Sequence, residues 1–404
     1  MAKKRYEESS IAAIAEKIRS HTGGDKKYTV AEMADGVDEA AEAAADDKEA
    51  VTRALIDRSI TEIVIPEGVD EVGNFAFCGC NLVRYIDIPD GLTSIGSQSF
   101  NGVGGTYGAD GKGPDGEVII PDSVNVLGTN AFVWSGVRKF VISKNVNFIN
   151  ESTFGGCSKC VLYDFSRHES VPTLKDVNAF NQMPNYNKAK IYVPPELYEE
   201  WVVATNWATY ADYIVPKASE GLAIAYGNGW GMDAEQYTVM GRGSCTDAFV
   251  VVPEKYDDGI HGELEVKDMA YEAFINDNVL TAIYIPKTIT EIGTNPISNC
   301  PNLKKIYMTG VTALASIHFN YLTALEYVKF GSGLTLIGGG TFSGCAAGAV
   351  YDFTACESVP TLDSYGAGQE FGTEPVIKVP ASLYEEWKAA TNWTLYEDYI
   401  VAAE

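Results

Sequence analysis

The residues that could do chemistry in this chain are few, and their spacing supports little of it. The chain has four scattered histidines: His21, His168, His261 and His318. None has a partner at the short spacing that zinc sites or catalytic triads use. Cys157 and Cys160 have the gap of a redox or metal-ligand pair, but no second pair accompanies them. We therefore expect no catalytic, metal or cofactor site, and the chain is predicted not to be an enzyme.

Glycine-rich and acidic stretches also have a plain structural interpretation. Residues 227–231 and 338–340 lie in no strand-to-helix unit with a phosphate-binding lysine, so we predict turns there. Acidic pairs such as Asp257 and Asp258 lack the loop spacing of a calcium site and indicate solvated surface. A glycan hydrolase is the least favoured alternative. The elements that would position a binding surface therefore become the main question.

Length and charge limit the class of protein. At 404 residues the chain exceeds the size of a single core, so two or three units are expected. Its 30 Lys and Arg against 55 Asp and Glu give a formal charge of -25, which disfavours nucleic acid and anionic membranes as partners. No signal peptide or membrane insertion is expected, because no apolar run follows the basic residues near Met1. The eight cysteines are accordingly predicted to be thiols.

A repeated phrase that begins near residue 60 decides the predicted fold. Each copy is an apolar triplet and a Pro or small residue, followed by an apolar residue, an aromatic residue and a Gly–Cys step. The copies recur at steps of 23, 32 and 22 residues in the first half and 33, 23 and 22 in the second. They start at Ile63, Ile86, Val118, Phe140, Val250, Ile283, Ile306 and Val328. Because no copy can bury its apolar face alone, stacked copies must share one core in a solenoid of short parallel strands.

Each half closes on the same segment, so the chain is a tandem duplication. Leu197–Trp201 returns as Leu383–Trp387, at an offset of 186 residues. This segment is predicted to form a helix whose Trp and Tyr residues cap the solenoid. The predicted domains are residues 1–57, a helical segment, and two capped modules at 58–216 and 217–404. The recurring turn cysteines are predicted to be small buried residues: Cys80, Cys157, Cys300 and Cys345.

The phrases resemble the BspA-type leucine-rich repeats, whose units look like Ile-x-Ile-Pro-x-x-Val-x-x-Ile-Gly-x-x-Ala-Phe-x-x-Cys. Residues 63–80, 86–100, 283–300 and 328–345 fit that pattern well. The resemblance implies two leucine-rich-repeat modules with parallel short-strand sheets, a mostly β fold with helical caps. Members of that family are found as surface adhesins and as binding modules of many kinds, so the resemblance implies binding rather than chemistry.

The N-terminal segment has a different character. Ile11, Ile14 and Ile18 form the apolar stripe of a short helix, and Met33 and Val37 begin a weak heptad seam in a second one. A solvated helix or linker is the alternative interpretation of the seam. The segment resembles the opening of structural proteins of tailed bacteriophages and prophages. That resemblance implies attachment to virion proteins, and the seam would permit a homotrimer.

Binding is expected on the outward-facing rows of the strands, because alternate strand residues face opposite sides of a sheet. The rows include Tyr85 and Asp87 in the first module, and Tyr284, Tyr307 and Tyr327 in the second. Exposed Tyr residues on a rigid sheet suit protein or carbohydrate recognition, because Tyr offers contact area and a hydroxyl at low entropic cost. The alternative is that Tyr merely favours strands.

Two functions follow from these patterns. The first is a phage virion protein, a tail fibre, appendage or decoration, made in the host cytoplasm and displaying its repeats to a host-surface protein or glycan. The alternative is a bacterial cell-surface or secreted adhesin of the same repeat family, exported by a route that the sequence does not show.

Overall fold

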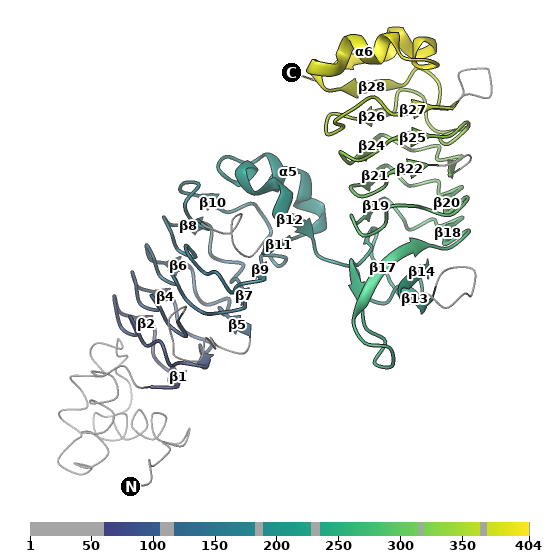
Figure 1. Ribbon diagram of the computed structural model, residues 1–404. Coiled ribbons are helices and arrows are strands. Elements are labelled where there is room, and N and C mark those ends of the chain that lie inside the picture. Colours follow the sequence, from purple (N-terminus) through teal and green to yellow (C-terminus); the bar gives the residue numbers. More distant parts are fainter. Residues whose placement is uncertain are drawn as a thin grey trace, which may run out of the picture. The chain divides into compact units, whose positions relative to one another are not determined.

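The computed structural model describes residues 60–105, 117–181, 189–227, 235–314, 318–363 and 370–403. The chain divides into two units, the first ending at Lys217 and the second beginning at Ala218. Each unit is a stack of coils whose short strands pair in parallel (Figure 1). The predicted solenoid of parallel-strand repeats is therefore confirmed.

Unit 1 has two strand-bearing faces. On its broad face β1 (Glu62–Val64) pairs with β3 (Tyr85–Asp87), and a five-stranded parallel sheet follows in the order β12-β11-β9-β7-β5. Its strands are β5 (Glu117–Ile119), β7 (Lys139–Val141), β9 (Leu162–Asp164), β11 (Lys190–Val193) and β12 (Ile214–Pro216). The second face holds two-residue strands: β2 (Glu71–Val72), β4 (Ser94–Ile95), β6 (Val126–Leu127), β8 (Phe148–Ile149) and β10 (Thr173–Leu174). The central register row of the broad face, from Ile63 to Ile214, is buried against the core.

Unit 2 repeats this arrangement with a continuous seven-stranded broad sheet. The strands, in order, are β15 (Phe249–Val251), β19 (Ala282–Ile285), β21 (Lys305–Met308), β24 (Tyr327–Phe330), β26 (Val350–Asp352), β28 (Val376–Val379) and β29 (Ile400–Ala402). Its second-face strands are β18 (Phe274–Ile275), β20 (Ile297–Ser298), β23 (Phe319–Asn320), β22 (Ala313–Leu314), β25 (Leu336–Ile337) and β27 (Thr361–Leu362). Both the central row of the broad sheet and the inward side of these short strands supply the core.

A column of stacked aromatic rings runs through each core. In unit 1 the ring centroids of Phe77, Phe100, Phe132, Phe154 and Phe180 are successively 5.4, 5.0, 5.9 and 5.4 Å apart. In unit 2 Phe319, Phe342, Phe371 and Trp393 are separated by 5.3, 6.0 and 5.6 Å. The column exists because the repeat places one large side chain at the same point of each coil, and offset stacking favours these separations.

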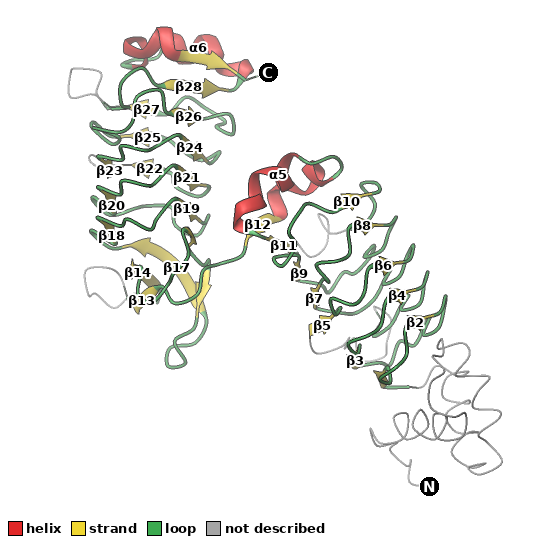
Figure 2. Ribbon diagram, turned by 180° about the vertical axis from the view of Figure 1, so that it is seen from behind, coloured by secondary structure: helices red, strands yellow, loops and turns green. Residues whose placement is uncertain are grey.

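Each solenoid ends in the predicted helical cap. In unit 1 the cap is a 3-10 turn (Pro195–Leu197), α5 (Tyr198–Val203) and a second 3-10 helix (Trp207–Tyr213). Unit 2 has Ala381–Leu383, α6 (Tyr384–Ala389) and Trp393–Tyr399. Both caps anchor a buried indole, since Trp207 Nε1 donates to the carbonyl of Pro172 at 2.7 Å and Trp393 Nε1 to that of Pro360 at 2.8 Å. The Trp residues are thus core residues. Figure 2 shows each helical cap at the end of its own stack.

The other end of the unit 2 stack has a cap of its own that the sequence patterns did not predict. β13 (Ala223–Tyr226), β14 (Tyr237–Gly241), β17 (Leu264–Met269) and β16 (Lys255–Tyr256) form a four-stranded mixed sheet in that order. Tyr237, Val239 and Val266 from this sheet join the unit 2 core. The sheet therefore covers the first coil as α6 covers the last.

Several predictions from sequence fall on residues outside the described ranges. The N-terminal stripe and seam lie there in full: Ile11, Ile14, Ile18, Met33 and Val37. Among the residues that the structure describes, no helix is long and apolar enough to cross a membrane.

Truncating the aromatic column should destabilise unit 1. Phe132→Ala is expected to lower the free energy of unfolding by about 3–5 kcal/mol, because Phe100 and Phe154 stack on its two sides and the cavity cannot collapse. Phe148, which is 45% exposed on β8, provides the control, and Phe148→Ala should cost no more than about 0.5 kcal/mol. Urea unfolding measures both variants, and equal losses would contradict a continuous column.

Candidate functional site

The outward face of the broad sheet in unit 1 is open to solvent at its first strands. Tyr85 is 49% exposed on β3, and Asp87 is exposed two residues later on the same side of the strand. Ile119 on β5, at the repeat position of Asp87, is 54% exposed. Next to it, Glu117 and Lys139 form an ion pair of 2.7 Å across β5 and β7. The face thus combines an exposed phenol, an apolar side chain and charges on a rigid support.

The same face of unit 2 differs from expectation. We expected Tyr284, Tyr307 and Tyr327 to form an exposed row, but Tyr284 is only 5% exposed and Tyr307 only 2%. This expectation was wrong for both residues, and Tyr327 is half-buried. The Tyr307 ring lies 5.8 Å from Phe249, 6.4 Å from Tyr284 and 6.1 Å from Tyr327, centroid to centroid. Because neighbouring strands lie about 4.8 Å apart, large side chains in adjacent positions pack against each other.

Polar contacts extend this cluster of rings in unit 2. The Tyr327 hydroxyl donates to the carboxylate of Asp352 at 2.5 Å, and the hydroxyl of Thr309 lies 3.4 Å from that of Tyr284. Burial raises the pKa of Asp352, but hydrogen bonds from Thr354 and Tyr327 outweigh it and hold that pKa below its ordinary value. The sequence signal for the cluster was available, because four neighbouring strands all carry an aromatic residue at an outward position. A binding role for Tyr85, Asp87, Tyr284, Tyr307 and Tyr327 stays a prediction.

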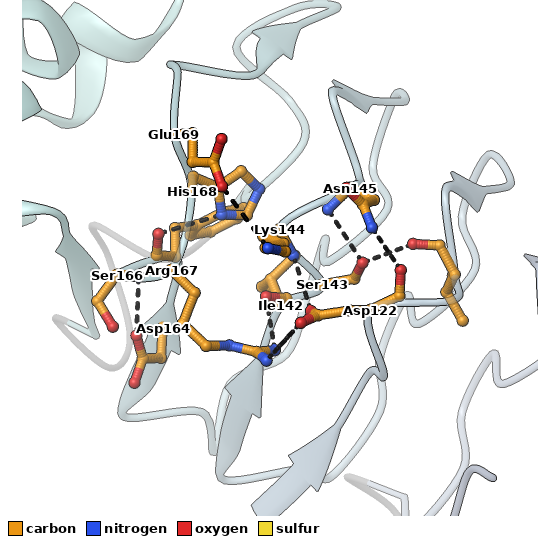
Figure 3. A network of polar contacts seen from close by, with 12 residues as sticks. Asp122, Ile142, Ser143, Lys144, Asn145, Asp164, Ser166, Arg167, His168 and Glu169 are labelled. Atoms are coloured by element: carbon orange, nitrogen blue, oxygen red, sulfur yellow. Dashed lines mark hydrogen bonds and ion pairs between the residues drawn. The ribbon is translucent and has the colours of Figure 1, made fainter. Parts of the chain in front are cut away.

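A polar network ties three consecutive coils of unit 1 together at the ends of β5, β7 and β9 (Figure 3). Arg167 Nη1 lies 3.1 Å from both carboxylate oxygens of Asp122, and Asn145 Nδ2 donates to the Asp122 carbonyl at 2.6 Å. Asp164 accepts the backbone N–H of Ser166 at 2.9 Å. Each charged group is engaged by a neighbouring coil or its own turn, so the network is suited to fixing coil spacing rather than to catalysis.

His21 lies outside the described residues, and each of the other three histidines has its own local partners. His168 is buried and its ring nitrogens lie 3.1 and 3.3 Å from the carbonyl oxygens of Phe165 and Val146. His261 Nδ1 lies 2.8 Å from a carboxylate oxygen of Asp258 in an exposed loop, and its ring stacks on Tyr226 at 3.8 Å. Within the described part of the chain, no group of three or more His, Cys, Asp or Glu side chains could hold a metal ion.

The cysteines are interior residues. Seven of the eight are buried, and these include the four turn cysteines, Cys80, Cys157, Cys300 and Cys345, as predicted. Burial raises the pKa of Cys157 to about 11 and that of Cys160 further still, and a Cys157 thiolate would add to the shift of Cys160. Because the thiolate is the reactive form, burial disfavours redox or metal-binding chemistry of this pair at neutral pH.

Comparison with known families identifies these coils. A family model described as BspA type leucine rich repeat region matches the chain in six copies, over residues 52–106, 116–197 and 260–366. Those residues make up more than half of the sequence. The chain belongs to the BspA-type leucine-rich-repeat family. No curated protein matches it.

Several solved structures are similar to this BspA-type chain. A leucine-rich repeat protein from Bacteroides ovatus is 17% identical over 86% of this chain and 85% of its own, with a TM-score of 0.24. A leucine rich cell surface protein from Faecalibacterium prausnitzii is 16% identical over 79% and 63%, with a TM-score of 0.26. The pneumococcal vaccine antigen PcpA is 14% identical over 85% and 77%, with a TM-score of 0.24.

Thiol labelling tests the burial of the cysteines. At a pH of about 8 a chromogenic disulfide reagent should modify Cys78 first, because it is partly exposed while the other seven are buried. Cys78→Ser should remove this fast reaction, and unfolding should release all the remaining thiols. A fast reaction that persists in Cys78→Ser but disappears in Cys157→Ser would contradict the assignment.

His168 should make unit 1 less stable in mild acid. Burial lowers the pKa of its ring from the ordinary 6.5, so the unfolded chain takes up a proton more readily than the folded one. The stability that neutral His168 provides is complete above pH about 6.5 and decreases as the pH falls below it. Urea unfolding should show the advantage of the natural chain over His168→Gln shrinking between about pH 8 and pH 5. An advantage that stays constant over this range would refute the prediction.

Proposed function

We propose that this chain is a non-catalytic recognition protein of the adhesin type, displayed on the outside of a bacterium. The observation that carries the proposal is the pair of capped BspA-type solenoids, each of which holds outward side chains at fixed spacing on a parallel sheet. Such a scaffold makes an extended rigid surface, because each coil contributes residues at equivalent positions. Rigid side chains lose little entropy on binding, which favours recognition of a large partner.

The chemistry of the exposed face in unit 1 supports a macromolecular partner. Tyr85 and Ile119 are about half exposed, and Asp87 and the Glu117–Lys139 pair surround them. Aromatic and apolar side chains flanked by charges are typical of protein- and glycan-binding surfaces. The formal charge of -25 disfavours anionic partners such as nucleic acids.

The carboxylates of the broad sheets support a role without catalysis. Asp164 and Asp352, the two buried acids at equivalent positions of the two units, each accept a hydrogen bond from the turn that follows their strand. The carboxylate of Asp352 also accepts hydrogen bonds from the hydroxyls of Thr354 and Tyr327. These acids are structural partners of their own coils rather than poised general acids.

A virion role is the second candidate, and the N-terminal resemblance to phage structural proteins is the observation in its favour. Attachment through Ile11, Ile14, Ile18, Met33 and Val37 to virion proteins, and assembly as a homotrimer, are parts of this proposal. Family membership concerns the repeats and supports the surface adhesin instead.

Locating the native protein separates these candidates. Antibodies raised against the full chain should label intact cells of the bacterium that makes it, and protease added to intact cells should remove the label. A cytoplasmic protein serves as the control for cell integrity. Beads coated with the full chain should also adhere to host tissue cells more than albumin-coated beads do. Label that appears only after lysis, or that sediments with phage particles, would overturn the proposal.

A further inference from the structure

In several described coils, the second residue after a buried core side chain such as Phe77 or Phe319 has a left-handed backbone. In unit 1 these residues are Gly79, Gly102, Trp134 and Gly156, with φ of 76°, 69°, 56° and 70°. In unit 2 they are Asn276, Asn299, Tyr321 and Gly344, with φ of 55°, 52°, 53° and 70°. Gly and Asn adopt this conformation readily, whereas a bulky aromatic residue there is a strained exception.

The two exceptions occupy equivalent places in the duplicated units. Trp134 and Tyr321 are 187 residues apart, within one residue of the 186-residue offset between the two caps, and both precede a coil that carries a Gly–Cys step. The backbone N–H of Trp134 donates to Gly155 at 2.8 Å, and that of Tyr321 donates to Ser343 at 3.0 Å. Both units therefore hold a strained aromatic residue at the same point of the same turn.

Each ring rests on the glycine of the next coil. A Cβ atom at Gly156 would lie 2.0 Å from Cδ1 of Trp134, and one at Gly344 would lie 2.8 Å from Cδ1 of Tyr321. The glycine thus provides the space that the ring occupies. Trp134 is nevertheless 54% exposed and Tyr321 64% exposed. We call Trp134 with Gly156, and Tyr321 with Gly344, the two aromatic shelves.

A carboxamide accompanies each shelf. In unit 1, Asn181 Oδ1 lies 2.7 Å from the point where a Cβ of Gly155 would stand, so this group flanks the glycine turn. In unit 2, Asn299 holds the shelf position one coil before Tyr321, and its side chain donates to that of Asn276. An exposed aromatic ring supported on one side by a glycine matches the apolar C–H face of a sugar ring.

We propose that the two aromatic shelves bind saccharide rings, one on each unit, and that the glycan recognised is uncharged. This inference rests on the proposed adhesin function and names its ligand class. The apolar C–H face of a pyranose lies on the ring of Trp134 or Tyr321. The charge of -25 favours neutral glycans over sialylated or sulfated ones.

Glycine substitution tests the shelves without harming the fold. Gly stands at this position in four other coils, three in unit 1 and one in unit 2, that share the left-handed φ, so Trp134→Gly and Tyr321→Gly remove the ring and also relieve strain. The full chain and the double variant are applied to an array of neutral oligosaccharides built from glucose, galactose, mannose and N-acetylglucosamine. The double variant should bind the retained glycans at least about tenfold more weakly, the loss typical of a hot-spot residue. It should unfold at the same urea concentration as the natural chain or a higher one.

Phe75 provides a matched control, since it is 56% exposed with φ of 61° but belongs to another turn position. Phe75→Gly removes an exposed strained ring in the same way and should leave glycan binding unchanged. Trp134→Tyr, which copies the shelf of unit 2, should retain binding.

The outcomes separate this inference from the adhesin proposal. Glycan binding that is lost in the double variant and kept in Phe75→Gly supports the shelves. Coated beads that adhere to host cells equally with the natural chain and the double variant would overturn the shelves and leave the adhesin function standing, with a protein partner indicated. A chain that binds neither cells nor glycans would overturn both.

Discussion

Coil-to-coil register is the constraint on which the rest of this structure depends. Parallel pairing at a spacing of about 4.8 Å sets each residue beside its counterpart in the next repeat. Ile283, Ile306 and Val328 therefore form one buried row, and the column of rings from Phe77 to Phe180 forms another. A shift of one residue would expose a whole row at once, so the register is strongly specified. The caps follow from the same constraint, because the last row of a stack must be covered.

The sequence predicted those features that recur in every coil. The buried positions of the strands, the turn cysteines and the Trp-bearing caps each appear several times, so periodicity identifies them. It failed for features that occur once. The sheet of β13, β14, β17 and β16 has no counterpart among the repeats. Its first two strands, β13 and β14, pair antiparallel, unlike the strands of the coils. The burial of Tyr307 was missed because strand alternation gives the side of a sheet on which a residue lies but not what its lateral neighbours cover.

Stacking also explains why so little reactive chemistry is left among the polar residues that the structure describes. A turn repeated at every coil brings hydrogen-bonding groups of successive coils within reach of one another. Asp122 is engaged by Arg167 and Lys144 of later coils, and the Cys157 thiol lies 3.1 Å from the carbonyl of Phe132. Such contacts satisfy buried groups, but they fix the acids and thiols in roles that hold neighbouring coils together. Recognition is then left to the side chains that point away from the stack.

The strained turns show how a scaffold of this kind can carry a specific surface. Register forces the backbone of each turn into the same left-handed conformation, whichever residue occupies it. A substitution at that position alters what projects from the turn without changing the stack, and it costs local strain in one coil. Trp134 and Tyr321 occupy a position where glycine or asparagine would adopt the same conformation with less strain. Two copies of the module nevertheless hold an aromatic ring there, and in both the next coil leaves room for it with a glycine. The same pairing of an exposed ring with a glycine of the next coil in both units favours a role in contacting a partner over a role in packing the fold.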